Sequence, residues 1–208
     1  MFDNVKIIEC PRDAMQSIKT FIPTHTKLSY LQSVVDVGFD VVDIGSFVSA
    51  KAIPQLSDTS DIINGIELSN SISKLLVIVA NSKGALKASN FDKVSYLGYP
   101  FSISENFQMR NTNKTIKDSV DELKEIISIA KDSDKKVVVY LSMCFGNPYG
   151  DPWNLNIVNH WANKLSQMGI KIISLSDTIG SSNPDSIHSI FSSVLDNHKH
   201  IEFGAHLH

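Results

Sequence analysis

Two histidines one residue apart, His206 and His208, stand in the stretch GAHLH at the end of the sequence. On a β-strand, residues i and i+2 face the same side, so both imidazoles would point toward one place. Near the start of the chain, in CPRDAMQ, Arg12 and Asp13 end an apolar run. Two imidazole nitrogens and one carboxylate oxygen suit a divalent ion such as Mg²⁺, Mn²⁺, Zn²⁺ or Fe²⁺. We therefore predict that Asp13, His206 and His208 bind a divalent metal ion.

Further charged residues end other apolar runs. Asp43 follows VV and Asp177 follows SLS. An ordinary structural interpretation exists for each: a surface ion pair for Arg12 with Asp13, and a turn or helix cap for the other two carboxylates. The functional interpretation places these carboxylates at one edge, beside an arginine whose fixed charge faces a carbonyl or carboxylate oxygen. We interpret Cys144 as a core residue rather than a nucleophile.

Strands and helices alternate along the whole chain. Between the strands we expect six helices, and the clearest helix signals are Gly38 as a C-terminal stop and Asn183 with Pro184 as an N-terminal start. Apolar strands that alternate with helices indicate a parallel sheet covered by helices. The predicted strands are residues 5–10, 40–45, 75–80, 93–98, 136–142, 170–176 and 201–208, and the clearest helices are 24–38, 82–89, 116–133, 155–169 and 183–197.

Two architectures fit this alternation, an open doubly wound sheet and a closed barrel. The first predicted strand is not followed by a glycine-rich phosphate turn, which weakens a dinucleotide-binding interpretation. Polar residues instead follow six of the seven predicted strands, as they do around the active-site rim of a (β/α)8 barrel. We therefore predict an α/β protein of the TIM-barrel type, a single catalytic domain over residues 1–208. We expect it to be truncated after the seventh strand, without the last βα unit.

Composition excludes several classes of protein. The 208 residues are 42% hydrophobic and 20% charged, with a formal net charge of -3. Without a basic excess we expect no nucleic-acid partner, and without a long apolar run we expect no membrane span. The start, MFDNVKIIEC, lacks the pattern of a signal peptide. Two cysteines give no disulfide framework, so we expect a cytoplasmic protein.

Six motifs together resemble a known family. PRDAMQ, DIGSFVSAKAIPQ, NSKG, GNPYG, SLSDTIG and GAHLH occur in the order found in hydroxymethylglutaryl-CoA lyase, a member of the metal-dependent carbon–carbon lyases and aldolases built on the (β/α)8 barrel. The resemblance covers essentially the whole chain. The SFVSAKAIPQ stretch is the more specific part, because related Claisen-type synthases share the Arg-Asp pair.

The resemblance implies an activity and its requirements. The reaction is cleavage of 3-hydroxy-3-methylglutaryl-CoA to acetyl-CoA and acetoacetate, in leucine degradation and ketone body metabolism. The implied cofactor is Mg²⁺ or Mn²⁺, the substrate is an acyl-CoA thioester, and the complete enzyme is expected to be a homo-oligomer, a dimer. Asp13, His206 and His208 match the family's metal ligands, and Arg12 matches the arginine that stabilises the enolate of the leaving acetyl-CoA.

Further site residues follow from the same resemblance. Asp43 stands where the family usually has glutamate, and Asp177 matches a position at the active-site rim. The general base stays open among Asp13, Asp43 and His206. We predict Arg12, Asp13, Asp43, Asp177 and His206 as catalytic residues, and Arg12, Gln16, Ser46 and Lys83 as substrate-binding residues.

Two features set this chain apart from the resemblance. The family's fourth metal ligand, an asparagine, and its glycine-rich loop with a reactive cysteine would lie beyond position 208, so we expect a truncated sequence.

The alternatives to this lyase function are a condensing synthase or pyruvate-type aldolase of the same superfamily, an Fe(II) oxygenase or hydrolytic zinc site, and a non-catalytic fragment that needs a partner.

Overall fold

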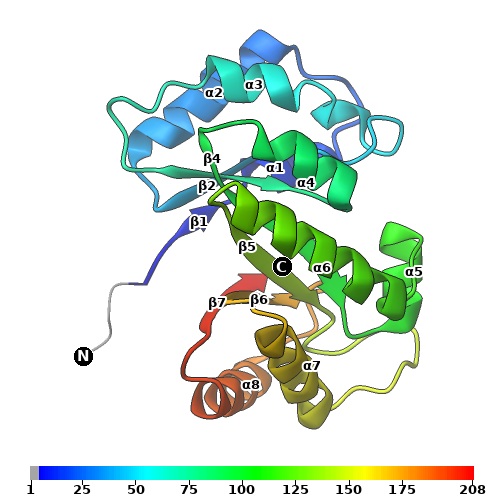
Figure 1. Cartoon of the computed structure of the whole chain (residues 1–208). Helices are drawn as coiled ribbons and strands as arrows, with labels where there is room; N and C mark the ends of the chain where they lie inside the picture. The colour runs from blue at the N-terminus through cyan, green and yellow to red at the C-terminus, as the bar shows by residue number, and fades with distance from the viewer. Residues whose placement is uncertain (1–4) are drawn as a thin grey trace. The chain divides into compact units, whose positions relative to one another are not determined.

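The computed structural model describes residues 5–208, and in this part of the chain seven strands form one sheet. Each strand lies next to the strand that follows it in the sequence, in the order β1 to β7. Figure 1 shows the ribbon of the chain, coloured along the sequence. A doubly wound sheet reverses its strand order part-way, whereas a barrel does not. The observed order therefore confirms the predicted fold class, an incomplete (β/α)8 barrel. The strands are β1 (Ile8–Glu9), β2 (Val41–Ser46), β3 (Lys74–Ile78), β4 (Val94–Ser102), β5 (Lys136–Ser142), β6 (Ile172–Asp177) and β7 (Glu202–Leu207).

The five helices predicted most clearly are all present. Gly38 ends the first of them in the left-handed conformation at φ 84°, and Asn183 caps the last through a capping box with Ser186. A glycine readily adopts the left-handed conformation that ends a helix, and an asparagine side chain can accept a hydrogen bond from the first turn of a helix. These two properties predicted the helix ends at Gly38 and Asn183. The helices are α2 (Thr24–Val37), α4 (Ser82–Ser89), α6 (Ile116–Asp132), α7 (Leu155–Gln167) and α8 (Pro184–Asn197).

Short helices also form in several stretches where the sequence showed no clear helix signal. The expectation that Arg12 and Asp13 stand at the end of the first strand is wrong, since β1 ends at Glu9 and a helix begins at Pro11. Proline suits the first position of a helix because its missing N–H needs no partner there. The additional elements are α1 (Pro11–Gln16), the 3₁₀ turn η1 (Pro54–Leu56), α3 (Thr59–Gly65) and α5 (Glu105–Thr112).

The chain divides into two compact units. Of the described residues, the first unit holds 5–97 and 129–136, with β1, β2 and β3 paired in parallel. The β2–β3 register shifts between Asp43 and Gly45. A Cβ at Gly45 would lie 2.6 Å from a Thr59 methyl, so only glycine allows α3 to approach β2 this closely. The bulge carries Ser46 to the carboxyl end of the strand.

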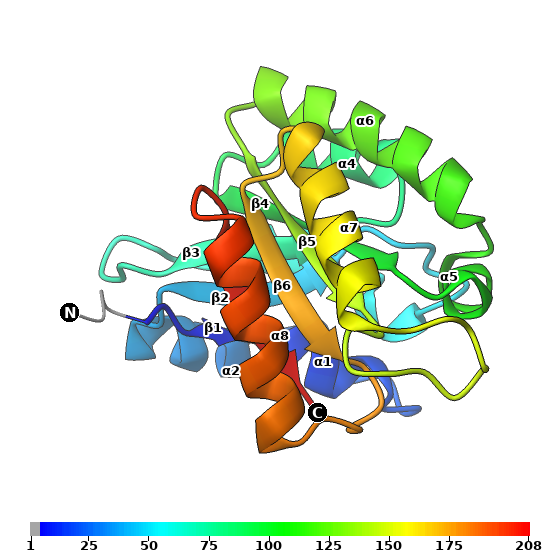
Figure 2. The ribbon, with the colours of Figure 1, turned by 90° about the horizontal axis from the view of Figure 1, so that it is seen from below.

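The second unit holds residues 98–128 and 137–208. Its strands β5, β6 and β7 are parallel, and Ser176 is paired with His206 in the β6–β7 register. Helices α7 and α8 lie side by side against this part of the sheet (Figure 2). Their contact faces bury Val158, Leu165 and Ile190. Across residues 5–208, no helix combines the length and the apolar character that a membrane crossing requires.

Candidate active site

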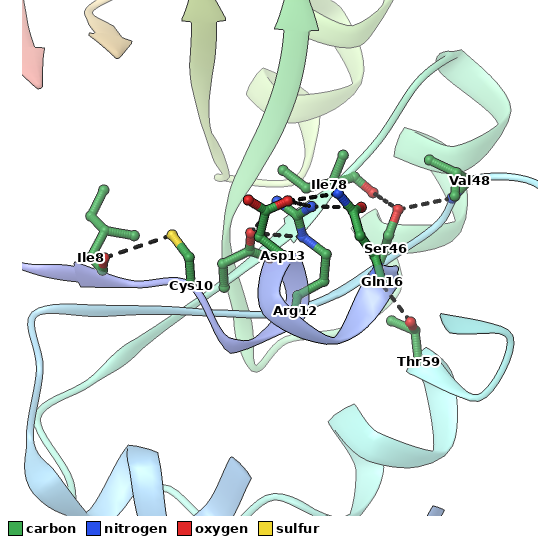
Figure 3. Close-up of polar contacts among 10 residues, drawn as sticks. Ile8, Cys10, Arg12, Asp13, Gln16, Ser46, Val48, Thr59 and Ile78 are labelled. Carbon is green, nitrogen blue, oxygen red and sulfur yellow. Dashed lines mark hydrogen bonds and ion pairs between the residues drawn. The ribbon is translucent and has the colours of Figure 1, made fainter. Parts of the chain in front are cut away.

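In the first unit, Arg12 is the centre of a charged cluster. Its Nε and Nη2 atoms donate to one carboxylate oxygen of Asp43, at 2.9 and 2.6 Å. Its Nη1 atom donates to Asp13 at 2.8 Å and to the Gln16 amide oxygen at 3.0 Å. The Gln16 amide donates in turn to Asp13 at 2.7 Å, and Figure 3 shows these side chains of α1 directed toward one another. One guanidinium thus joins three of the predicted site residues.

The local sequence explains how α1 presents this cluster. Arg12 and Gln16 are four residues apart, so they share a helix face, and Asp13 is three residues from Gln16. The helix has only six residues and no side-chain N-cap, so it cannot be stable alone. Its buried Pro11, Arg12 and Met15 attach it to the rest of the unit. Asp13 therefore comes from the helix after β1, not from the strand as we predicted.

Asp43 lies on β2 with 0% of its surface exposed. Its bonds to Arg12 show a role other than the turn cap that the sequence left open. A buried carboxylate is stable only when paired, and Arg12 supplies that pairing. Burial, together with the nearby Asp43 charge, raises the pKa of Cys10 to about 12, so this thiol beside the cluster stays protonated.

Ser46 and Lys83 line one cavity of about 370 Å³ in the first unit. The Ser46 hydroxyl donates to the Ile78 carbonyl at 3.2 Å and accepts from the Val48 amide at the same distance (Figure 3). Ser46 therefore shapes the turn after β2, while Lys83 is exposed on the first turn of α4. The cavity lining includes two of the four predicted substrate-binding residues, and Lys87 adds a second cation to it.

In the second unit, the two terminal histidines lie side by side as their spacing predicted. The ring centroids of His206 and His208 are 4.9 Å apart. His208 Nδ1 lies 2.9 Å from the carbonyl oxygen of Asp177. Because a carbonyl only accepts, Nδ1 carries the proton of the neutral ring, and Nε2 carries the lone pair. This backbone contact is the usual way in which a metal-binding histidine is oriented.

The Asp177 carboxylate lies in the turn between β6 and α8. One of its oxygens accepts from the Ser181 amide at 2.8 Å and the other accepts from the Ser182 amide at 2.9 Å. Burial raises the pKa of Asp177, but these hydrogen bonds more than offset it and hold the pKa below its usual value. The side chain stabilises the turn, while the backbone carbonyl of the same residue orients His208.

Two further residues of the second unit, Tyr140 and Met143, were not identified from the sequence as candidate site residues. The Tyr140 ring lies 5.4 Å from the His206 ring, edge to face, and only 8% of the residue is exposed. A tyrosine at the carboxyl end of an otherwise aliphatic strand is the feature that could have identified it. Met143 follows that strand with a positive φ of 65°, a strained conformation of the kind that gathers at functional sites. Cys144 is fully buried, in agreement with the predicted core role.

Comparison with known proteins places this geometry in a family. The HMGL-like family model matches residues 4–208, nearly the whole chain. The chain belongs to the HMGL-like family. Its PRDAMQ, GSFVSAKAIPQ and GAHLH motifs are thus the sites of the Arg12 cluster, the Ser46 turn and the histidine pair in a member of this family.

Known relatives and solved structures agree with that assignment. The chain is 30% identical over 194 residues to the cytoplasmic 3-hydroxy-3-methylglutaryl-CoA lyase of Rattus norvegicus, covering 92% of this chain and 55% of the relative. It is 34% identical to the mitochondrial hydroxymethylglutaryl-CoA lyase of Bos taurus, covering 58% of that protein. The chain therefore spans a little over half the length of these relatives.

A solved HMG-CoA lyase from Acenitobacter baumannii, in complex with coenzyme A and 3-methylmalate, has the same fold. It superimposes with a TM-score of 0.90 at 28% sequence identity, covering 98% of this chain and 66% of that one. At this coverage every strand of the HMGL-like chain has a counterpart in a lyase, which agrees with the incomplete barrel inferred from the strand order.

Proposed function

We propose that the protein containing this chain is a hydroxymethylglutaryl-CoA lyase that cleaves 3-hydroxy-3-methylglutaryl-CoA to acetyl-CoA and acetoacetate. The observation that carries the proposal is the Arg12 cluster, which joins α1 to Asp43 on β2, in a chain of the HMGL-like family whose relatives bear that enzyme name. The substrate class is an acyl-CoA thioester.

The proposal includes a divalent metal, Mg²⁺ or Mn²⁺, held by Asp13, His206 and His208. The donor set fits, because it offers a carboxylate and two imidazoles, and the Nδ1 contact of His208 leaves the lone pair on Nε2. A bound divalent ion polarises the substrate hydroxyl and carboxylate oxygens as a Lewis acid.

The side chains of the first unit then have separate roles. The C3 hydroxyl loses its proton to a base, and its oxygen becomes the ketone of acetoacetate as the C2–C3 bond breaks. The electron pair of that bond moves onto the thioester as an enolate, which takes up a proton at C2 to give acetyl-CoA. Arg12 balances the charge that develops on the thioester oxygen, an interaction of the oxyanion-hole kind. Asp43 is fully buried against Arg12, so it holds the guanidinium and does not meet substrate. This leaves Asp13 or His206 as the base.

Substrate binding is assigned to Gln16, Ser46 and Lys83. Gln16 is exposed on α1 beside Arg12, where its amide reaches the acyl group, and the Ser46–Lys83 cavity lies beside the same end of β2. Asp177 acts through its carbonyl on His208. We further propose a single catalytic domain, a homodimer, a cytoplasmic location like that of the rat relative, and a place in leucine degradation.

The direct test measures acetoacetate release from 3-hydroxy-3-methylglutaryl-CoA with added Mg²⁺ or Mn²⁺, for this chain and for the chain extended by the C-terminal segment of a family lyase. Activity of the extended protein that is abolished by His208→Ala supports the proposal. An extended protein that folds and binds Mn²⁺ but releases no acetoacetate refutes it.

A further inference from the structure

A cluster of buried polar residues joins η1 to α2 in the first unit. Gln55 on η1 is 3% exposed, and Lys27 on α2 is 2% exposed. The Lys27 ammonium donates to the backbone carbonyl of Gln55 and to an Asp58 carboxylate oxygen, the latter at 2.9 Å. The second oxygen of Asp58 accepts from the Thr24 hydroxyl at 2.8 Å. A buried charge is tolerated when it is paired in this way, so Gln55 sits on a fixed support.

The Gln55 side chain uses its amide on one short segment, residues 18–22. Its Nε2 donates to the carbonyls of Ile18 and Thr20, at 3.0 and 2.9 Å. Its Oε1 accepts from the Ile22 amide at 2.9 Å. Both amide protons and the amide oxygen are thus bonded to backbone groups two to six positions after α1 ends at Gln16.

Few other interactions order the segment that receives these bonds: the Ile18 amide donates to the Met15 carbonyl at 3.0 Å, and the Lys27 ammonium lies 4.0 Å from the centroid of the Phe21 ring. Residues 17–21 are exposed and lie outside any helix or strand. An exposed stretch of this kind opens easily unless its backbone groups are bonded. The preceding helix α1 is only six residues long, and its last residue, Gln16, belongs to the Arg12 cluster. Loss of order in residues 18–22 would therefore reach α1 directly.

We propose that Gln55 is a positioning residue, which fixes residues 18–22 and through them holds Arg12, Asp13 and Gln16 in place on α1. This role rests on the proposed function for its catalytic meaning, but its mechanical part concerns α1 alone. Gln55 touches neither the guanidinium nor the carboxylates of the cluster in any of its bonds to residues 18–22.

Gln32 offers a matched control within the same unit. Its side chain also bridges to a backbone, since Nε2 donates to the Glu67 carbonyl at 3.0 Å and Oε1 accepts from the Glu67 amide at 2.9 Å. Gln32 is half-buried and does not contact α1 or residues 18–22 through these bonds. Gln32→Ala therefore removes a similar glutamine bridge without the proposed effect.

The experiment compares Gln55→Ala and Gln32→Ala in the full chain by hydrogen exchange and by limited trypsin digestion. In Gln55→Ala, amide exchange in residues 11–22 and cleavage after Lys19 should both rise at least roughly tenfold, because local opening no longer breaks the three bonds. Gln32→Ala should match the wild-type protein at both places. If Gln55→Ala does not fold, Gln55→Asn takes its place in both measurements. Asparagine keeps the amide group, but its shorter side chain does not reach residues 18–22.

Mn²⁺ affinity separates a positioning role from a merely structural one. Weaker holding of Asp13 should raise the Mn²⁺ dissociation constant of Gln55→Ala several-fold. Unchanged exchange in residues 11–16, or wild-type Mn²⁺ affinity in a protein whose residues 18–22 have loosened, overturns the inference. A wild-type protein that binds no Mn²⁺ counts instead against the metal part of the proposed function, and the exchange of α1 then decides the inference.

Discussion

Replacing Asp43 with asparagine tests whether the Arg12–Asp43 pair is the support of the site. The substitution keeps the size of the side chain and removes its charge. Arg12 would then stay buried, with a side-chain exposure of 10%, beside a neutral group. Removing one partner of a buried ion pair leaves the other charge buried and unpaired. The free energy lost in this way is larger than the net stabilisation that the intact pair provides.

The structure sets the size of the effect. A buried pair that loses one partner destabilises a protein by about 3–5 kcal/mol. The lower end applies here, because Arg12 keeps its 2.8 Å bond to Asp13. We therefore expect Asp43→Asn to lower the free energy of unfolding by about 3 kcal/mol.

Asp121 provides the control, because it pairs with Lys124 at 2.7 Å while both side chains are 61% exposed. An exposed pair contributes little to stability because solvent screens it, so Asp121→Asn should hardly move the unfolding midpoint. Urea unfolding followed by circular dichroism measures both variants. Equal midpoints for Asp43→Asn and Asp121→Asn would show that the buried pair does not support the site.

Three further outcomes are expected. Gly84→Ala should destabilise the protein, although alanine favours a helix, because its Cβ would lie 2.7 Å from the Phe47 carbonyl oxygen. Gly204→Ala should be tolerated, because the atom nearest to its Cβ would be 3.7 Å away. The thermal unfolding temperatures of the two variants test this difference. Burial, followed by the charge of His200, lowers the pKa of His198 below 6.5 in the folded protein. The stability that neutral His198 contributes is therefore complete above about pH 6.5 and is lost as the pH falls through the pKa of the folded state. Unfolding curves from pH 7.5 to 5 should show a fall in the free energy of unfolding that is smaller in His198→Gln. In an active extended protein, Arg12→Gln should reduce turnover of 3-hydroxy-3-methylglutaryl-CoA at least about 100-fold, far more than it changes Mn²⁺ affinity, and near-normal turnover would remove Arg12 from the mechanism.

Much of the fold follows from local patterns in the sequence. Apolar runs predicted β5 at residues 136–142 with the bounds that the structure shows, and the 82–89 helix likewise. Gly38 and Asn183 marked helix ends because left-handed backbone and a side-chain acceptor are local requirements. The i, i+2 spacing placed His206 and His208 side by side, since strand geometry alone determines it.

Only the tertiary structure assigned partners to the charged residues. The sequence left Asp43 open between a cap and a site residue, and its pairing with Arg12, 31 positions away, decided the matter. The same holds for Gln55, whose amide bonds to residues more than 30 positions earlier. The helix α1 also escaped prediction, because six residues without a side-chain cap carry no periodic signal and are stable only when packed. Local spacing determines which side chains share a face, whereas the partner that a buried charge finds depends on strands and turns brought together from distant parts of the chain.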